Sequence, residues 1–246
     1  WTSPYTMPSF PIYSESWESI FKPRFKQESG DRPQVSEPIA ELPAETPYYR
    51  PSPALAANDS ALVAVWVEHA ELDNSGTLVI GALDRSAHQF SRTGTIARNR
   101  NGIHDPSVTL VGTNGDALVT WTQNDRNAGD VENGESVGTL LRSENVHVAF
   151  FDAAVGGVTN TFKVADASGN RMDGNVQIAV APDGTNAMAV WASMEPSASS
   201  TDITGARLFR VNGKWEMGDP RTIATTSGLD RDLSIGVLAD GTYLIS

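Results

Sequence analysis

An internal repeat is the feature that most limits what this chain can fold into. Short apolar segments rich in Val, Ala and Leu recur along the sequence, and three of them end in a tryptophan, at Trp66, Trp121 and Trp191. Residues 241–246 begin a fourth copy, which stops one position before the tryptophan is expected. Such self-similarity is typical of repeat architectures, in which each unit buries its faces against its neighbours.

Each repeat has the pattern of four short β-strands. One strand precedes the tryptophan segment across a turn such as Asn114-Gly115 or Asp183-Gly184, and two more strands follow it. Apolar stretches of this length between turn-forming residues indicate strands, and no window sustains the apolar period of a helix. The sequence therefore predicts an all-β fold, a β-propeller, with the tryptophans between blades. Stacked sandwiches are the alternative, but they predict strict apolar and polar alternation.

The predicted blades occupy residues 51–103, 104–170 and 171–229, and residues 230–246 form part of a fourth. About three and a half blades make an incomplete ring, because propellers usually have four to eight. An unpaired edge and an open core would otherwise face water. We therefore expect the rest of the propeller in residues beyond this chain or in another protein chain, which would be its partner.

Residues 1–50 are of a different character. Residues 1–53 hold ten of the 14 prolines and nine of the 19 aromatic residues of the chain. Proline fixes φ and removes a backbone donor, which excludes a long helix or a central strand here. One interpretation is an extended arm whose rings anchor on a folded surface or a partner chain. The other is an interdomain connector.

Composition excludes several classes of function. The chain has 18 Lys and Arg against 30 Asp and Glu, a formal charge of −12, which argues against nucleic-acid binding and docking on anionic lipid. No apolar run approaches the length of a membrane-spanning helix, so no direct membrane insertion is expected. With no cysteine, neither disulfides nor thiolate metal sites can form.

Two resemblances rest on these repeats. Residues 176–184, leading to Trp191, and residues 105–108, leading to Trp121, resemble the repeat of large secreted or surface-anchored bacterial proteins. This resemblance covers residues 50–246 and implies a propeller in an extracellular or cell-surface location. Residues 104–107 and 231–234, with the turn at 240–243, also look similar to five-bladed β-propeller glycosidases, although Leu233 replaces the proline of that pattern.

A set of charged residues precedes the first strand of each blade. In a closed ring these residues would surround one mouth of the central channel, where an acidic glycan or a peptide could bind. Paired carboxylates there could also hydrolyse a glycosidic bond, and the alternative is a set of ion pairs that cap turns and join blades. The predicted ligand-binding residues are Arg50, His104, Asp105, Arg171, Asp173, Arg231 and Asp232.

The loop after Trp121 is long and acidic. Its oxygen-bearing side chains at Asp125, Asn127, Asp130 and Glu132 suit Ca²⁺, which makes calcium the one cofactor that the sequence suggests. The calcium-loop pattern is only partly met, and a solvated acidic loop is the alternative. The four histidines show no metal-binding spacing.

Taken together, these patterns favour a non-catalytic, extracellular or cell-surface β-propeller module that binds a ligand or assembles with partner proteins. The alternatives are a propeller-fold glycoside hydrolase acting on polysaccharide and a purely structural subunit of a surface layer or appendage.

Overall fold

The computed structural model describes residues 53–69, 75–84, 89–99, 102–125, 144–164, 172–195, 198–225, 227–228 and 233–246. The predicted arm, residues 1–50, lies outside these ranges. The secondary structure of the described residues is made of β-strands. None of these segments forms a helix that is long and apolar enough to cross a membrane.

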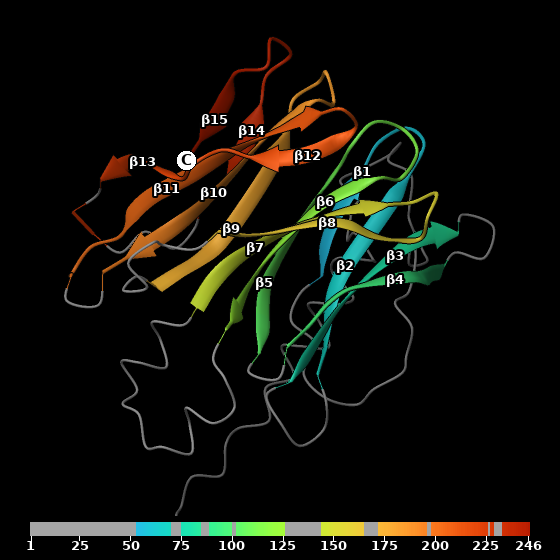
Figure 1. Ribbon diagram of the computed structural model, residues 1–246, viewed down its shortest axis with the longest axis horizontal. Coiled ribbons are helices and arrows are strands. Elements are labelled where there is room, and N and C mark those ends of the chain that lie inside the picture. The colour runs from blue at the N-terminus through green and yellow to red at the C-terminus, as the bar shows by residue number, and fades with distance from the viewer. Residues whose placement is uncertain are drawn as a thin grey trace, which may run out of the picture.

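The strands form successive antiparallel sheets, which follow one another in chain order (Figure 1). The first sheet contains β1 (Ala54–Ala57), β2 (Leu62–His69), β3 (Gly76–Asp84) and β4 (Gln89–Asn99). The second contains β5 (Ile103–Leu110), β6 (Ala117–Asn124), β7 (Glu144–Asp152) and β8 (Gly157–Val164). The third contains β9 (Met172–Val180), β10 (Asn186–Met194), β11 (Asp202–Val211), β12 (Lys214–Met217) and β13 (Arg221–Thr225). A hairpin of β14 (Ile235–Val237) and β15 (Tyr243–Ile245) follows.

This arrangement confirms the all-β class and the repeating four-stranded unit, so we call the three sheets blades 1, 2 and 3. In each blade the strands pair in chain order, and the first strands β1, β5 and β9 lie beside one another. The second strand is covered on both faces, because a blade lies between neighbours. In β6, seven of eight residues are buried, and these include the polar residues Thr120, Thr122 and Asn124 as well as the apolar ones.

Two of the three repeated tryptophans, Trp121 and Trp191, fill the spaces between blades as predicted, whereas Trp66 packs against Ala64 and Val79 of its own blade. Trp121 of blade 2 packs with Val65 and Ile80 of blade 1, and Trp191 of blade 3 packs with Val146 of blade 2. Each of these indoles is about 1% exposed. Since an aromatic side chain of this size dominates the energy of the core that it enters, these two tryptophans hold consecutive blades together.

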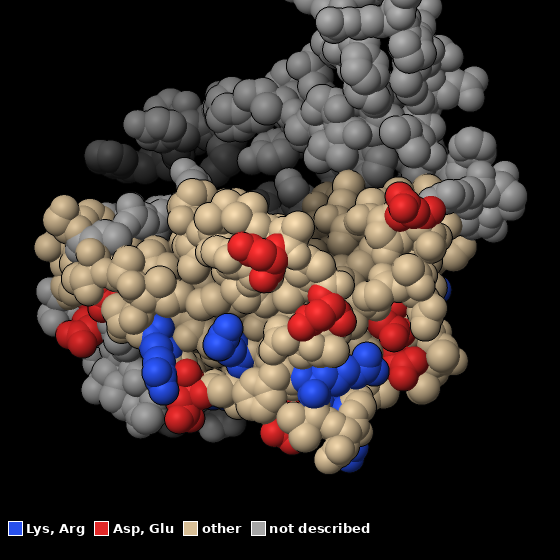
Figure 2. All heavy atoms as spheres, turned by 90° about the horizontal axis from the view of Figure 1, so that it is seen from above, with Lys and Arg blue, Asp and Glu red and all other residues tan. Residues whose placement is uncertain are grey.

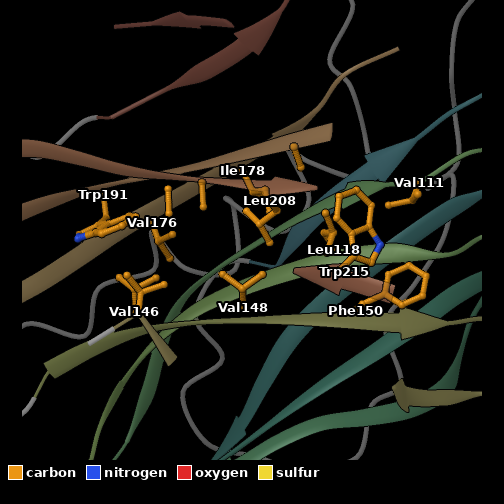
Figure 3. Close-up of a cluster of buried hydrophobic side chains, with 14 residues drawn as sticks. Val111, Leu118, Val146, Val148, Phe150, Val176, Ile178, Trp191, Leu208 and Trp215 are labelled. Atoms are coloured by element: carbon orange, nitrogen blue, oxygen red, sulfur yellow. The ribbon is translucent and has the colours of Figure 1, made fainter. Parts of the chain in front are cut away.

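A second tryptophan closes the other end of the interface between blades 2 and 3 (Figure 3). The ring of Trp215, on β12, lies 6.2 Å from the ring of Phe150, on β7. The guanidinium of Arg210 lies 5.6 Å from the Phe150 ring centroid on the solvent side, within the range of a cation–π interaction. Trp191 and Trp215 therefore pack at opposite ends of one apolar interface.

The outer strands differ from the sequence-based prediction. The apolar pattern of the sequence predicts that the fourth strand of blade 1 covers only residues 94–97, whereas in the structure this strand runs over Gln89–Asn99. In blade 3 the expected strand at 221–224 is β13, but β12 also pairs with β11, so the outer strand of this blade is in two pieces. Polar and charged residues dominate these strands, and their weak apolar signal explains why their ends were missed.

Candidate functional site

The innermost strands of blades 2 and 3 share a backbone irregularity. In β5 the residues Asp105 and Pro106 stand opposite Trp121 alone, and in β9 the residues 175 and 176 stand opposite Trp191 alone. Each is a β-bulge, in which one extra residue bends the strand and redirects a side chain. The bulges put Asp105 and Asn175 at equivalent positions, with φ of 50° and 51°. Aspartate and asparagine tolerate this left-handed conformation better than most residues.

A pocket of about 590 Å³ lies where the innermost strands of the three blades meet. The prolines Pro53 and Pro106 contribute apolar surface, and the polar atoms come mainly from the two bulges and the residues beside them. The polar side chains of the lining are Asp105, Ser107, Asn175 and Gln177. Most of the lining surface is polar, which differs from the predominantly apolar lining of many small-ligand sites.

His104 fixes the carboxylate of Asp105. Its Nδ1 lies 2.9 Å from Asp105 Oδ2, and its Nε2 lies 2.8 Å from Glu144 Oε2. An ionised carboxylate can only accept, so both ring nitrogens must donate. Glu144 is held in turn by Asn124, whose side-chain nitrogen lies 3.2 Å from Oε1. The imidazole thereby joins the innermost strand of blade 2 to the start of β7.

These contacts set the charge states of His104 and Asp105. The hydrogen bonds to Asp105 and to Glu144 raise the pKa of His104 to about 10, against the opposing effect of burial. The hydrogen bond from His104, helped by the backbone amide of Asn175, lowers the pKa of Asp105. At neutral pH the pocket therefore presents an ionised Asp105 backed by a protonated His104.

Asn175 brings an unused donor to the pocket. Its side-chain nitrogen Nδ2 is buried without a hydrogen-bond partner among the described residues. Beside it, Ser107 Oγ lies 3.5 Å from Gln177 Oε1, which is at the limit of a hydrogen bond. Because Nδ2 has almost no exposed surface, a ligand could accept a hydrogen bond from it only once the Asn175 side chain turns towards the pocket, which would remove the cost of leaving this amide unsatisfied.

The predicted ligand-binding set is only partly placed. His104 and Asp105 lie together at the pocket, whereas Asp173 is 5% exposed inside blade 3, where Ser193 Oγ lies 2.5 Å from its carboxylate. Asn175, not Asp173, is the counterpart of Asp105, because each is the first residue of the bulge opposite the tryptophan, whereas Asp173 pairs with Ser193 as Ile103 pairs with Gln123. The other predicted members lie outside the described residues, and these are Arg50, Arg171, Arg231 and Asp232.

The calcium prediction is represented by Asp125 alone, since Asn127, Asp130 and Glu132 lie outside the described residues. Asp125 Oδ2 lies 2.7 Å from the Lys163 ammonium and 3.1 Å from His147 Nε2. Burial opposes its ionisation, but the hydrogen bonds from His147, Lys163 and Gln123 outweigh it, so the pKa of Asp125 lies well below its usual range. Within the described ranges, no group of three or more acidic or histidine side chains is placed to hold a metal.

The sequence did not indicate Ser107, Asn175 or Gln177 as site residues. They are polar residues inside apolar strands, and the signal that could have found them is their position relative to the tryptophan across the strand pair. The distribution of charged side chains over the surface does not indicate the site either. On the face shown in Figure 2, acidic and basic side chains are interspersed, and neither sign forms a continuous patch.

Comparisons with known proteins find similar folds at low identity. No protein-family model matches the chain, and no curated protein matches it. Among solved structures, an endo-arabinase from Bacteroides thetaiotaomicron is 10% identical, with a TM-score of 0.42, over 78% of this chain and 68% of that one. An alpha-L-arabinanase from Penicillium chrysogenum is 10% identical, with a TM-score of 0.49, over 76% of this chain and 53% of that one. A sucrose-6-phosphate hydrolase from Lactobacillus gasseri is 12% identical, with a TM-score of 0.45, over 76% of this chain and 40% of that one.

Proposed function

We propose that this chain is a non-catalytic β-propeller module that binds a neutral carbohydrate in the pocket between its innermost strands. The observation that carries the proposal is the pairing of an ionised Asp105 with the unpartnered amide of Asn175 across two blades. One group accepts a hydrogen bond and the other donates one, which is how adjacent sugar hydroxyls are held.

The charge of the pocket favours a neutral ligand over the acidic glycan considered from the sequence. Asp105 is the only charged side chain in the described lining, and His104 is directed at Asp105 and Glu144. An anionic ligand would therefore approach a carboxylate with no free cation beside it among these residues. The faces of Pro53 and Pro106 offer apolar surface to the ring of a sugar.

The resemblance of the repeats to secreted bacterial proteins supports the second part of the proposal, an extracellular or cell-surface location. Detection of the chain in the culture medium or on intact cells tests it. Confinement to the cytoplasmic fraction would contradict it.

Binding is tested with a panel of neutral and acidic oligosaccharides measured by calorimetry. We expect Asp105→Asn to weaken binding of the best neutral sugar about ten- to hundredfold, the usual effect of losing a hydrogen bond to a charged group. Asp219→Asn is the matched control, because Asp219 is exposed and lies outside the pocket lining. Failure of every sugar to bind, or equal losses in both variants, would refute the proposal.

A glycoside hydrolase is the second candidate, and the ionised state of Asp105 favours it. Such a carboxylate suits a base or a nucleophile, and hydrolysis also needs a carboxylic acid within about 5–9.5 Å. Asp232, the sequence-based candidate for a second acid, lies outside the described residues. Release of reducing sugar by the wild-type chain, lost in Asp105→Asn, would replace the binding function with this one.

A further inference from the structure

Three side chains form a hydrogen-bonded network behind Asp105. It begins at His104, whose two ring nitrogens lie 2.9 Å from Asp105 Oδ2 and 2.8 Å from Glu144 Oε2. It ends at Asn124, whose side-chain nitrogen donates to Glu144 Oε1 at 3.2 Å. We call His104, Glu144 and Asn124 the support network of Asp105, because none of these three described residues is part of the pocket lining.

The support network extends across three neighbouring strands of blade 2. His104 lies on β5 and pairs with Thr122 on β6, and Asn124 on β6 pairs with Glu144, the first residue of β7. The pairing of β6 with β7 therefore fixes the position of Glu144. From this position its carboxylate holds the side of the His104 ring that is turned away from Asp105.

Glu144 strengthens the hydrogen bond between His104 and Asp105 in two ways. It holds the ring at Nε2, so the ring cannot turn about its bond at Nδ1. Its carboxylate also favours the protonated imidazole, as the direction of the His104 pKa shows. Hydrogen bonds between ionised partners are shorter and stronger than those between neutral groups. Glu144 therefore acts on Asp105 without touching it.

The support network determines which part of Asp105 a ligand can reach. The Asp105 side chain lines the pocket and is 52% exposed, and its Oδ2 is taken by His104. The other carboxylate oxygen remains to accept a hydrogen bond from a ligand. A side chain that is half exposed has several rotamers of similar energy, and a partner behind it selects one of them.

Blade 3 forms the same bulge without such a network. Gly174 has the position of His104, because each pairs with the residue that follows the tryptophan of its blade. Nothing lies within 4 Å of the Cβ position of Gly174. Asn175 nevertheless has a φ of 51°, against 50° at Asp105. The support network is therefore not required to form the bulge, which favours a role in placing the carboxylate of Asp105.

We propose that Glu144 is a positioning residue of the sugar-binding pocket, which acts through His104 to hold the Asp105 carboxylate in the orientation that a ligand meets. This assignment rests on the proposed function, since it adds a residue to the same site. Glu144 does not line the pocket, so its effect on binding passes through Asp105. An effect that passes through one residue disappears when that residue is replaced.

The binding test uses maltose, cellobiose and lactose, three neutral disaccharides, measured by calorimetry. For the disaccharide that the wild type binds most tightly, we expect Glu144→Ala to weaken binding about tenfold. In the Asp105→Asn background, Glu144→Ala should change the affinity by less than about twofold. Glu144→Gln keeps an oxygen that accepts from His104 and should bind almost as tightly as the wild type. The matched control is Glu216→Ala, which should bind like the wild type because Glu216 is exposed on β12, outside the pocket lining.

A second measurement needs no ligand. In protein labelled with ¹⁵N at histidine, the Nδ1–H of His104 should give an NMR signal in the wild type and in Glu144→Gln, because its hydrogen bond to Asp105 slows exchange with water. Glu144→Ala should lose this signal. If no disaccharide binds, the proposed function fails, and the imidazole signal still shows whether Glu144 positions Asp105.

Two results would overturn the assignment of Glu144. One is an Nδ1–H signal that is unchanged in Glu144→Ala. The other is an equal loss of affinity from Glu144→Ala in the wild type and in the Asp105→Asn background, which would show an effect on the fold and not on Asp105. If Glu144→Ala does not fold, Glu144→Asp takes its place in both measurements, because its shorter side chain draws the carboxylate away from His104.

Discussion

Asp105 and Asn175 have the same left-handed backbone conformation at the same place in consecutive blades, with φ of 50° and 51°. The backbone of Asn175 also helps to lower the pKa of Asp105, so the two bulges interact electrostatically. A left-handed residue other than glycine costs about 1–2 kcal/mol, and this cost is lowest for aspartate and asparagine. Strain of this kind collects at functional sites, which agrees with the position of both residues at the pocket.

Substitutions at Asn175 separate its backbone role from its side-chain role. Asn175→Gly accepts the positive φ without strain, so we expect the free energy of unfolding in urea to change by less than about 1 kcal/mol. Asn175→Val places a β-branched residue in the same conformation and should cost about 1–3 kcal/mol. Both variants lack the amide and should lose sugar binding in calorimetry. Equal stability of the glycine and valine variants would contradict the role assigned to the bulge.

The contacts of His104 predict a pH dependence of stability. In the folded protein its pKa is raised to about 10, while the unfolded chain titrates near the ordinary value of 6.5. Between these values the folded state keeps a proton that the unfolded state releases, so the stabilisation is complete below pH 6.5 and declines as the pH rises towards 10. We expect the melting temperature of the wild type to fall across this window.

His104→Gln tests this assignment, because glutamine keeps a hydrogen bond and has no titratable proton. The slope of melting temperature against pH between 6.5 and 10 should be smaller in this variant than in the wild type. Glu144→Gln removes one of the two carboxylates and should give an intermediate slope. Identical slopes in all three proteins would show that His104 is not held in the protonated form.

Several features of the fold could be predicted because they depend on burial. Trp121 and Trp191 are recognised in the sequence by the apolar segments that lead to them, Ala117–Val119 and Ala187–Val190, whose residues are mostly buried. The two-piece outer strand of blade 3 could not be predicted. The piece that was missed, β12, is only four residues long and has Trp215 as its one buried residue, so the signal that burial imposes on a sequence is almost absent from it.

The pocket was predicted less well because its residues were sought among the charged residues that precede each blade. Asp105 and Asn175 both stand 16 residues before the tryptophan of their blade, but Asn175 carries no charge and was passed over in favour of Asp173. The contact between His104 and Glu144 could not be predicted either, because the two residues are 40 positions apart in the sequence.

Gly81 is expected to tolerate no side chain. A Cβ at this position would lie 2.8 Å from Cη2 of the buried Trp66 and 3.0 Å from a backbone oxygen of Ser91. Forcing an extra methyl into such a packed site costs about 1–3 kcal/mol, which we expect for Gly81→Ala in urea unfolding. Gly174→Ala is the matched control, because nothing lies within 4 Å of its Cβ position. Similar losses in both variants would contradict this account.

Asp173 is expected to matter for stability and not for binding. It is 5% exposed, its carboxylate lies 2.5 Å from Ser193 Oγ, and it does not line the pocket. Loss of a buried polar partner costs about 1–3 kcal/mol, so we expect Asp173→Ala to lower the free energy of unfolding by that amount. The Asp173→Ala variant should bind the sugar with wild-type affinity, although Asp105→Asn weakens binding of the same sugar. A folded Asp173→Ala protein with weakened binding would restore Asp173 to the ligand-binding set.

The contacts of Asp125 allow a test of the two interpretations of the loop after Trp121, a calcium site or a solvated acidic loop. The Asp125 carboxylate already contacts the Lys163 ammonium at 2.7 Å and His147 Nε2 at 3.1 Å, and a calcium ion would have to displace both contacts. We therefore expect the melting temperature to be the same after chelation and after addition of millimolar calcium. A ligand at a hundredfold excess over its dissociation constant stabilises a protein by about 2.7 kcal/mol, which is a shift of several degrees and easily measured. Such a rise with calcium, absent in Asp125→Asn, would establish the loop as a calcium site and would show that Lys163 gives way to the ion.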